Sequence, residues 1–286
     1  MAAVIPEKQK SPMAAEAPLT AENYKFLQDQ IHKASGIVLD EGKLYLIEAR
    51  LLPIVRKERL GGLNDLCALI RAVNGAGLKK QVVEAMTTNE TLFFRDPPVF
   101  EALQKSVFPE LVERRQSVRK LNIWSAAASS GQEAYSVSMV LREMGLSGWQ
   151  VRILGTDLND QILERARTGR YLQSEVNRGL PAKYLVKYFE RVGLEWQIKD
   201  EVRKMVEFAP LDLRQSLRTM GPFDLVLCRN ILIYFDVETK KKILGEIRQT
   251  LEGKGLLLLG SAETTLNLDD RFTRRVVNQA TFYEAP

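Results

Sequence analysis

The sequence predicts an α/β fold: a doubly wound parallel sheet preceded by a small all-α domain. Residues 20–86 show helical periodicity and contain no run that alternates like a strand. From about residue 121, short apolar runs alternate with helical stretches, which is typical of a parallel sheet with helices on both faces. This rhythm lapses in residues 171–222, where two alternating runs predict a short antiparallel β insertion at about residues 188–208.

The composition is that of an ordinary globular protein. The chain has 286 residues, 45% of them hydrophobic and 27% charged, which is enough to bury a substantial core. No apolar run reaches the length of a membrane span, and the first residues lack the apolar stretch of a signal peptide. We therefore expect a cytoplasmic protein without membrane insertion.

The few histidines and cysteines exclude several classes of chemistry. Cys67 and Cys228 lie far apart and in no metal-ligand spacing, so neither a disulfide framework nor a zinc site is expected. His32 is the only histidine of the chain. We expect no metal and no histidine-based catalytic triad.

The chain divides into four predicted segments. These are a disordered tail over residues 1–19, a helical domain over residues 20–86, a linker with a connecting helix over residues 87–120, and an α/β domain over residues 121–286.

The helical domain is predicted to contain helices over residues 20–34, 40–60, 64–73 and 78–86. Thr20 and Asn23 suit the cap of the first helix, and Gly36 suits its end. Pro53 predicts a kink or a break in the second helix. The core-facing positions of that helix are Leu44, Ile47, Leu51 and Val55.

Basic residues gather on the same second helix. Arg50, Arg56, Lys57 and Arg59 fall within ten residues, and the first three are predicted to share a solvated face. This face is either an ordinary solvated surface or a docking surface for an acidic partner. The net charge of the whole chain, +5, is small for a nucleic-acid-binding protein of this length.

In the α/β domain, strands are predicted over residues 121–124, 151–157, 223–228 and 256–261, and helices over residues 131–144, 159–167 and 236–251. The runs EWQIKD and KMVEFAPLD suggest further strands in the insertion.

The loop SAAASSGQE, which follows the first predicted strand, has almost no side chains. Ligands of open α/β sheets bind at the carboxyl ends of strands, and small side chains let a ligand approach the backbone. Asp157 ends the next predicted strand, where such folds place an acid on a ribose. The loop lacks the glycine pattern of dinucleotide and P-loop sites, so S-adenosylmethionine is the favoured ligand.

Two other stretches carry candidate polar groups. In TTNETLFFRD the candidates are Asn89, Thr91 and Arg95, and Arg95 is suited to clamp a carboxylate. The neighbouring Phe93 and Phe94 are predicted to face the core. In CRNILIYFD, the residues Arg229, Asn230 and Tyr234 follow a strand and should lie at the same sheet edge as the loop.

Together these stretches resemble the chemotaxis receptor methyltransferases, the CheR family, over roughly residues 20–284. The family pattern runs TTN-x-T-x-FFR, WSAAASxGEEPYS, a strand-ending Asp and CRNxxIYF. This sequence has TTNETLFFR, WSAAASSGQEAYS, GTDLND and CRNILIYFD in that order. The resemblance implies a Rossmann-like S-adenosylmethionine-dependent methyltransferase domain with an N-terminal receptor-docking domain.

The resemblance also implies the roles of individual residues. Arg95 would meet the substrate glutamate, and Tyr234 would face the reacting centre. The methyl donor would be bound by Asn89, Thr91, Arg95, Ala127, Glu133, Asp157, Asp212, Leu213, Arg229 and Asn230. Arg50, Arg56 and Lys57 would dock the cytoplasmic helical bundle of methyl-accepting chemotaxis receptors. The enzyme would act as a monomer at receptor arrays and release S-adenosylhomocysteine.

The sequence departs from the family pattern at three places. It has Gln132-Glu133-Ala134 for Glu-Glu-Pro, and Ser261-Ala262-Glu263 for His-Ser-Glu. It also has Asp212-Leu213 for Asn-Leu, and Asp212 can accept a hydrogen bond from adenosine but cannot donate one. Some family members grip a receptor pentapeptide with a loop containing Gly-x-Gly. Only Gly193 is present here, so we expect no dependence on that tether.

Two alternative functions remain open. Asp96-Pro97-Pro98-Val99 partly matches the D-P-P-aromatic motif of nucleic-acid amino methyltransferases, but Val99 cannot stack on a flipped base. A non-catalytic signalling module that binds S-adenosylmethionine is the other alternative. The chemistry itself requires no base, since a glutamate carboxylate is ionised at neutral pH.

Overall fold

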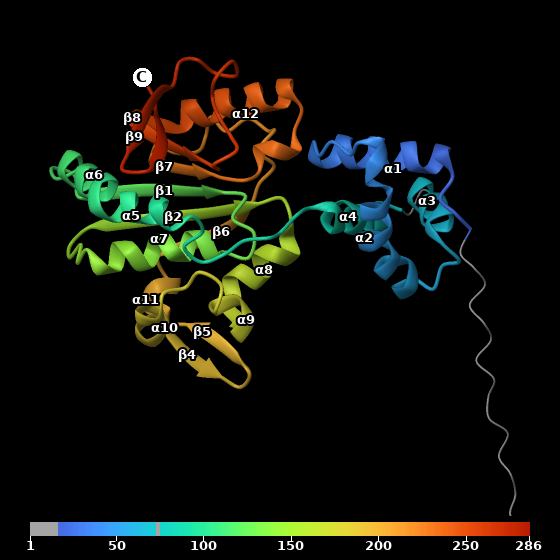
Figure 1. The fold of residues 1–286 in the computed structure, drawn as a ribbon, viewed down its shortest axis with the longest axis horizontal. Coiled ribbons are helices and arrows are strands. Elements are labelled where there is room, and N and C mark those ends of the chain that lie inside the picture. The colour runs from blue at the N-terminus through green and yellow to red at the C-terminus, as the bar shows by residue number, and fades with distance from the viewer. Residues whose placement is uncertain (1–16, 73–74) are drawn as a thin grey trace, which may run out of the picture. The chain divides into compact units, whose positions relative to one another are not determined.

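The structure, a computed structural model, describes residues 17–72 and 75–286 (Figure 1). Most of the predicted disordered tail, residues 1–16, lies outside the described residues. Contacts divide the chain into two compact units. The first holds the described residues as far as Ala34 together with those of Leu39–Met86, and the second holds Ser35–Val38 and Thr87–Pro286.

The first unit contains the predicted helices. They are α1 (Ala21–Ser35), the short 3-10 helix η1 (Glu41–Lys43), α2 (Leu44–Lys57), α3 (Leu63–Arg71) and α4 (Ala76–Met86). The hydroxyl of Thr20 accepts a hydrogen bond from the backbone N–H of Asn23 at 3.2 Å, which confirms the predicted start of α1.

Helix α2 continues through Pro53, which is exposed, so the helix does not break at this proline. One predicted core position of this helix is wrong. Leu44 was expected in the core but is 37% exposed, because it is the first residue of the helix and follows η1 directly. The other predicted core positions, Ile47, Leu51 and Val55, are buried as expected.

The second unit is built on a large mixed sheet with the strand order β6-β2-β1-β7-β8-β10-β9. In chain order these strands are β1 (Lys120–Ala126), β2 (Gln150–Asp157), β6 (Val206–Pro210), β7 (Phe223–Cys228), β8 (Leu251–Leu259), β9 (Thr273–Val277) and β10 (Ala280–Glu284). The strands from β6 to β8 run parallel to their neighbours, and β10 runs antiparallel to both β8 and β9. The mainly parallel sheet is as predicted, whereas the C-terminal hairpin β9–β10 was not predicted.

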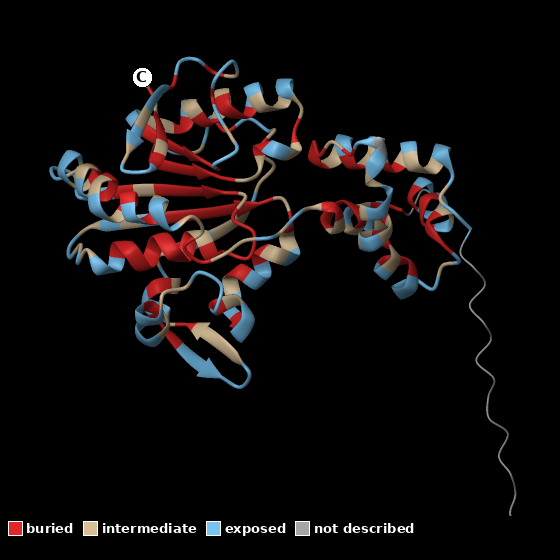
Figure 2. Ribbon diagram, in the orientation of Figure 1, coloured by how far each residue is buried: buried red, intermediate tan, exposed pale blue. Residues whose placement is uncertain are grey.

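Helices cover both faces of this sheet (Figures 1 and 2). Leu121 and Ile123 of β1 join one buried cluster, and Trp124 and Ala126 join a second. Successive strand residues point to opposite faces, so each cluster packs on its own side. The helices of this part are α5 (Pro97–Ala102), the π-helix η2 (Leu103–Val107), α6 (Phe108–Arg114), α7 (Gln132–Glu143), α8 (Asp160–Thr168) and α12 (Val237–Thr250).

A second, antiparallel sheet has the order β3-β5-β4, with β3 (Arg170–Leu172), β4 (Phe189–Val192) and β5 (Glu195–Ile198). The short helices α9 (Gln173–Val176), α10 (Ala182–Tyr188) and α11 (Asp200–Arg203) accompany it. The strand expected at residues 204–208 forms as β6, but it belongs to the large sheet and not to the insertion. The reason is its parallel pairing with β2 from Ile153↔Val206 to Asp157↔Pro210.

Gly179, in the turn after α9, lies directly against the segment that leads into α5. Its φ is +85°, and a Cβ atom on it would lie 2.1 Å from the carbonyl oxygen of Phe93. The side chain of Phe93 is fully buried, and that of Phe94 is 6% exposed. The backbone at Phe93 therefore packs directly against Gly179, and the buried side chains of Phe93 and Phe94 anchor it in the core.

We predict that Gly179→Ala destabilises the protein more than Gly145→Ala does. Both glycines have a positive φ, but a Cβ on Gly145 would meet nothing within 4 Å. In the control Gly145→Ala, only the strain of placing a side chain in the left-handed region should lower the free energy of unfolding. We expect a loss of about 1–2 kcal/mol, or roughly 2–8 °C in Tm. Gly179→Ala should lose clearly more, because the backbone of Phe93 must move. Equal Tm values in thermal unfolding would contradict the close approach.

Candidate active site

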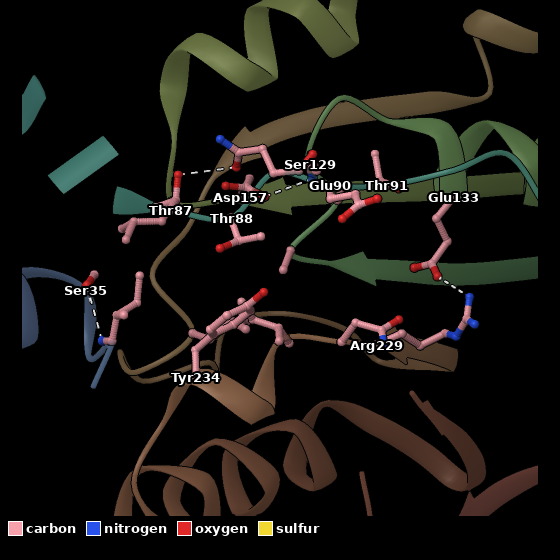
Figure 3. A pocket seen from close by; sticks show the side chains of 18 of the residues that line it. Ser35, Thr87, Thr88, Glu90, Thr91, Ser129, Glu133, Asp157, Arg229 and Tyr234 are labelled. Atoms are coloured by element: carbon pink, nitrogen blue, oxygen red, sulfur yellow. Dashed lines mark hydrogen bonds and ion pairs between the residues drawn. The ribbon is translucent and has the colours of Figure 1, made fainter. Parts of the chain in front are cut away.

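The site lies at the point where the strand order of the large sheet reverses. From β1 the chain proceeds to β2 and β6 on one side and to β7 and β8 on the other. Ligands of open α/β sheets bind outside the carboxyl ends of strands at such a point. A cleft with about 950 Å³ of empty space, partly open to solvent, lies there (Figure 3). All residues that line it belong to the second unit.

The cleft brings together every predicted donor-binding and catalytic residue. These are Asn89, Thr91, Arg95, Ala127, Glu133, Asp157, Asp212, Leu213, Arg229, Asn230 and Tyr234. They come from the segment before α5, the loop after β1, the start of α7, and the segments that follow β2, β6 and β7 or end these strands. Residues from separate segments of the chain therefore meet at one cleft.

The side-chain-poor loop after β1 is tightly folded. Ala127 and Ser129 have φ values of +57° and +51°, and Gly131, just before α7, has +91°. The N–H of Ala128 donates to the carbonyl of Thr156 in β2 at 2.8 Å. The loop thus stays close to the sheet, and its small side chains leave the backbone accessible from the cleft.

Asp157 ties this loop to the end of β2. One carboxylate oxygen accepts from the N–H of Ser129 at 2.9 Å (Figure 3), and the other accepts from the N–H of Asn159 at 3.0 Å. Burial raises the pKa of Asp157, and these backbone donors partly oppose the rise. Each oxygen still has capacity for another donor from the cleft.

Arg229 is the buried charge of the site, with 2% of its side chain exposed. It donates to Glu133 at 2.8 Å, to the carbonyl of Arg95 at 3.2 Å, and to the carboxylate of Asp96. Glu133 also accepts from the hydroxyl of Ser125 at 3.0 Å. Arg229 therefore joins the end of β7 to the start of α7, as Figure 3 shows for its contact with Glu133, and also to the segment before α5. The sequence alone does not reveal this network, because most of its members lie far apart in the chain.

Several polar groups at the cleft have no protein partner within residues 17–72 and 75–286. Arg229 Nε and Asn230 Oδ1 are buried without a hydrogen bond. The half-buried guanidinium of Arg95 and the hydroxyl of Tyr234 line the cleft and make no hydrogen bond or ion pair in this part of the chain. The guanidinium of Arg95 and the hydroxyl of Tyr234 are therefore available to a ligand in the cleft, whereas Arg229 Nε and Asn230 Oδ1 are enclosed by the protein.

The segment that carries Asn89 is fastened to the loop after β1. The carbonyl of Asn89 accepts from the hydroxyl of Ser129 at 2.8 Å, and its side-chain oxygen accepts from Thr87 at 3.3 Å. The hydroxyl of Thr87 also accepts from the amide of Asn159 at 3.2 Å. These bonds hold the backbone that leads to Thr91 along the cleft.

Asp212 is engaged by its neighbour Arg214. The guanidinium of Arg214 donates to both carboxylate oxygens, at 2.9 Å and 2.6 Å, and the backbone N–H of Arg214 donates at 2.9 Å. This bidentate pair fixes the carboxylate at the edge of the cleft. Leu213 beside it is buried.

Residues 35–38 belong to this unit, although the sequence pattern predicted them as part of the helical domain. Ser35 and Ile37 line the cleft, and the N–H of Val38 donates to the carbonyl of Tyr234 at 2.9 Å. Gly36 was interpreted only as a helix end. It has a φ of +77°, and a Cβ there would lie 2.8 Å from Arg214 Cδ. Gly36 was the one residue in this segment that could have indicated a close contact, but a single sequence does not reveal which residue the glycine packs against.

The predicted docking residues lie in the first unit and differ in exposure. Arg56 and Lys57 are exposed, and Lys57 donates to Gln81 at 3.2 Å. Arg50 is half-buried and donates to the carbonyl of Met86 at 2.6 Å. Arg50 thus satisfies a carbonyl at the end of α4, and the prediction that it shares a solvated face with the other two is wrong.

Within the part of the chain that the structure describes, no group of His, Cys, Asp and Glu residues is arranged to hold a metal ion. None of the helices in residues 17–72 and 75–286 is long and apolar enough to cross a membrane.

Comparison with known proteins identifies the family. The family model described as "CheR methyltransferase, SAM binding domain" matches residues 89–281, and "CheR methyltransferase, all-alpha domain" matches residues 22–87. The chain belongs to the CheR methyltransferase family. It is 40% identical over 261 residues to the chemotaxis protein methyltransferase Cher2 of Pseudomonas putida, covering 89% of this chain and 94% of that protein.

Two further relatives support the assignment. The chain is 41% identical to chemotaxis protein methyltransferase 1 of Pseudomonas aeruginosa, with coverage of 89% and 94%. It is 38% identical to the chemotaxis protein methyltransferase of Vibrio parahaemolyticus, with coverage of 93% and 98%. The predicted family and the predicted cofactor, S-adenosylmethionine, are confirmed.

The residues of the cleft fit this cofactor. A loop of small side chains beside a carboxylate with remaining acceptor capacity suits a nucleoside. Arg229 and Asn230, each with one buried side-chain atom that makes no hydrogen bond in the described residues, line the same cleft.

Proposed function

We propose that this enzyme transfers the methyl group of S-adenosylmethionine to glutamate side chains of methyl-accepting chemotaxis receptors. The products are glutamate methyl esters and S-adenosylhomocysteine. The observation that carries the proposal is the guanidinium of Arg95, which lines the cleft without an ion pair in the described part of the chain. Such a group is suited to bind a carboxylate that arrives with the substrate.

The bound donor supplies an electrophilic methyl group on a sulfonium sulfur. In the proposal, Asp157 accepts from the ribose hydroxyls and Glu133 accepts from the amino group of the methionine part. Asn89, Thr91, Ala127, Arg229 and Asn230 complete the donor site, with Asp212 and Leu213 at the adenine. Figure 3 shows Tyr234 and Asp157 on opposite sides of the cleft, which supports a place for Tyr234 beside the reacting centre.

The proposed reaction needs positioning more than proton transfer. A glutamate carboxylate is ionised at neutral pH, so it attacks the methyl carbon without a general base. One carbon–oxygen bond forms as the carbon–sulfur bond breaks, and the sulfonium becomes a neutral thioether. Arg95 orients the incoming carboxylate in line with the methyl group. It cannot bind the carboxylate too tightly, because the substrate loses negative charge in the transition state.

The proposed partners follow from the charge of the first unit. Receptor methylation sites lie on long helices rich in acidic residues, and the exposed Arg56 and Lys57 offer a basic surface to them. We propose that the enzyme acts as a cytoplasmic monomer at receptor arrays. Nucleic acid is not a partner in this proposal.

We further propose that the enzyme does not depend on a receptor pentapeptide. The β4–β5 hairpin turns through Gly193 and Leu194, since Val192 pairs with Glu195. Gly193 alone has a positive φ, +63°, in this turn. That turn is a compact two-residue type, which differs from the Gly-x-Gly loop of tether-binding relatives.

Asp157→Ala should weaken S-adenosylhomocysteine binding by roughly tenfold to 150-fold, the loss of one charged ribose contact. In the native enzyme, the affinity should fall as pH is lowered, and the fall should begin above the usual range of an aspartate because the pKa of Asp157 is raised. The sign follows because the protonated carboxyl accepts fewer hydrogen bonds. Calorimetry against pH measures both effects, and Asp157→Asn should remove this pH dependence. Unchanged affinity in Asp157→Ala would refute the assignment.

Arg95→Ala should lose nearly all methyl transfer to receptor membranes, measured as base-labile label. Arg95→Lys should recover little, because an ammonium cannot reproduce the planar fork of a guanidinium. Donor affinity should change less than turnover, and Tm should hardly change, because the side chain of Arg95 makes no hydrogen bond or ion pair in the described residues. A lysine variant with near-native turnover would show that the bidentate geometry is irrelevant.

Receptor C-terminal pentapeptides should bind no tighter than about 100 μM, or roughly −5.5 kcal/mol. Charge reversal at Arg56 and Lys57 should instead raise the KM for receptor, most strongly at low salt, and leave donor affinity unchanged.

The peptide titration and the charge reversal are both needed, because β4 is an edge strand to which a peptide strand could add. A low-micromolar peptide complex that is lost on deleting residues 193–199 would overturn the proposal.

A further inference from the structure

Glu263, in the loop after β8, accepts backbone hydrogen bonds from its own loop and from the turn after β7. One carboxylate oxygen accepts from the N–H groups of Ile231 at 2.9 Å and Leu232 at 2.7 Å. The other accepts from the N–H groups of Asn230 at 2.8 Å and Gly260 at 2.7 Å. Glu263 itself does not line the donor cleft. Its carboxylate is thus saturated by the chain's own backbone.

Three of these donors are consecutive in the chain. Successive N–H groups in a turn form a concave anion site, and here a side-chain carboxylate fills it. Asn230 has a φ of +58°, a left-handed conformation that Asn tolerates better than most residues with a side chain, with the help of local hydrogen bonds. Such a conformation persists only where the surroundings stabilise it. Four charge-assisted hydrogen bonds to Glu263 provide that stabilisation.

The loop that Glu263 holds carries much of the cleft. Arg229 precedes the three N–H groups, Asn230 contributes the first of them, and Tyr234 follows two residues after the last. All three of these side chains line the cleft. The carbonyl of Tyr234 also binds Val38. The backbone angles of residues 230–232 therefore decide where these side chains lie.

Gly260 shows how closely this arrangement is packed. A Cβ atom on Gly260 would lie 2.7 Å from Asn230 Nδ2, 2.7 Å from Glu263 Oε2 and 2.9 Å from Asn230 N. Its φ is outside the positive range, so a substitution there would act through steric contact alone.

We infer that Glu263 is a positioning residue for the methyl donor: from outside the cleft, its carboxylate fixes the loop that presents Arg229 and Asn230. The inference rests on the proposed donor contacts of those two residues. Glu263 itself touches no substrate or donor.

The first test is titration of S-adenosylhomocysteine into Glu263→Gln. In either orientation the glutamine presents an NH₂ group in place of one oxygen, so two backbone N–H groups lose their acceptor. We expect the donor Kd to rise about tenfold or more, because the loop must move to satisfy them. The donor KM should rise in step, and the KM for receptor should not. Glu263→Asp, which keeps the charge, should recover part of the affinity.

Gly260→Ala provides an independent variant that keeps the carboxylate. It should also weaken donor binding, because the added methyl group displaces Asn230 or Glu263. If Glu263→Gln fails to fold, Gly260→Ala and Glu263→Asp still test the inference. Donor affinity within about twofold of native in the folded variants, despite a lower Tm, would overturn it.

Glu246→Gln is the matched control. The carboxylate of Glu246, in α12, accepts from the backbone N–H of Leu217 at 2.8 Å, and neither residue lines the cleft. This variant should lower Tm and leave the donor Kd unchanged. Asp157→Ala belongs in the same series. If it weakens binding and the variants at Glu263 and Gly260 do not, this inference alone fails. If none weakens binding, the proposed donor site fails as well.

Discussion

The site depends on one buried charge, the guanidinium of Arg229. A cation removed from water must be paired and hydrogen-bonded, because the cost of desolvating it alone is several kcal/mol. Arg229 meets this requirement with Glu133 at the start of α7 and with Asp96 and the carbonyl of Arg95 before α5. These partners come from separate segments of the second unit. The contacts of this one guanidinium therefore fix three parts of the cleft relative to one another: the end of β7, the start of α7 and the segment before α5.

The chain's own hydrogen bonds organise most of the cleft. Asp157 binds two loop N–H groups, Asn89 is fastened to Ser129, and Glu263 fills the turn after β7. The side chain of Arg95 is left without such a bond in the described residues. This division suits a methyl transfer in which positioning provides most of the rate, since preorganised groups lose little entropy when the reactants bind.

Local sequence patterns predicted which segments form helices and strands better than they predicted which strands pair with one another. The apolar runs of β1, β2 and β7, each bounded by polar residues, identify these strands because burial on both faces requires such runs. The alternating run that became β6 was identified as a strand, but its pairing with β2 was not. The hairpin β9–β10 was missed, since Arg274 and Arg275 give β9 a polar sequence at a sheet edge. Leu44 was misplaced because periodicity does not locate the end of a helix.

The sequence by itself determined the fold class, the family, the cofactor and the residue types of the cleft, because motifs such as TTNETLFFR and CRNILIYFD are local and survive without knowledge of contacts. Only the tertiary structure decided how those residues are held. It paired Arg229 with Glu133, engaged Asp212 with Arg214, added residues 35–38 to the second unit and placed Glu263 behind the turn after β7. Most of these contacts join residues that are distant in the chain, and Asp212–Arg214 depends on side-chain conformation. Strand order and side-chain packing determine these long-range contacts and side-chain conformations, and a local sequence pattern encodes neither of these two features.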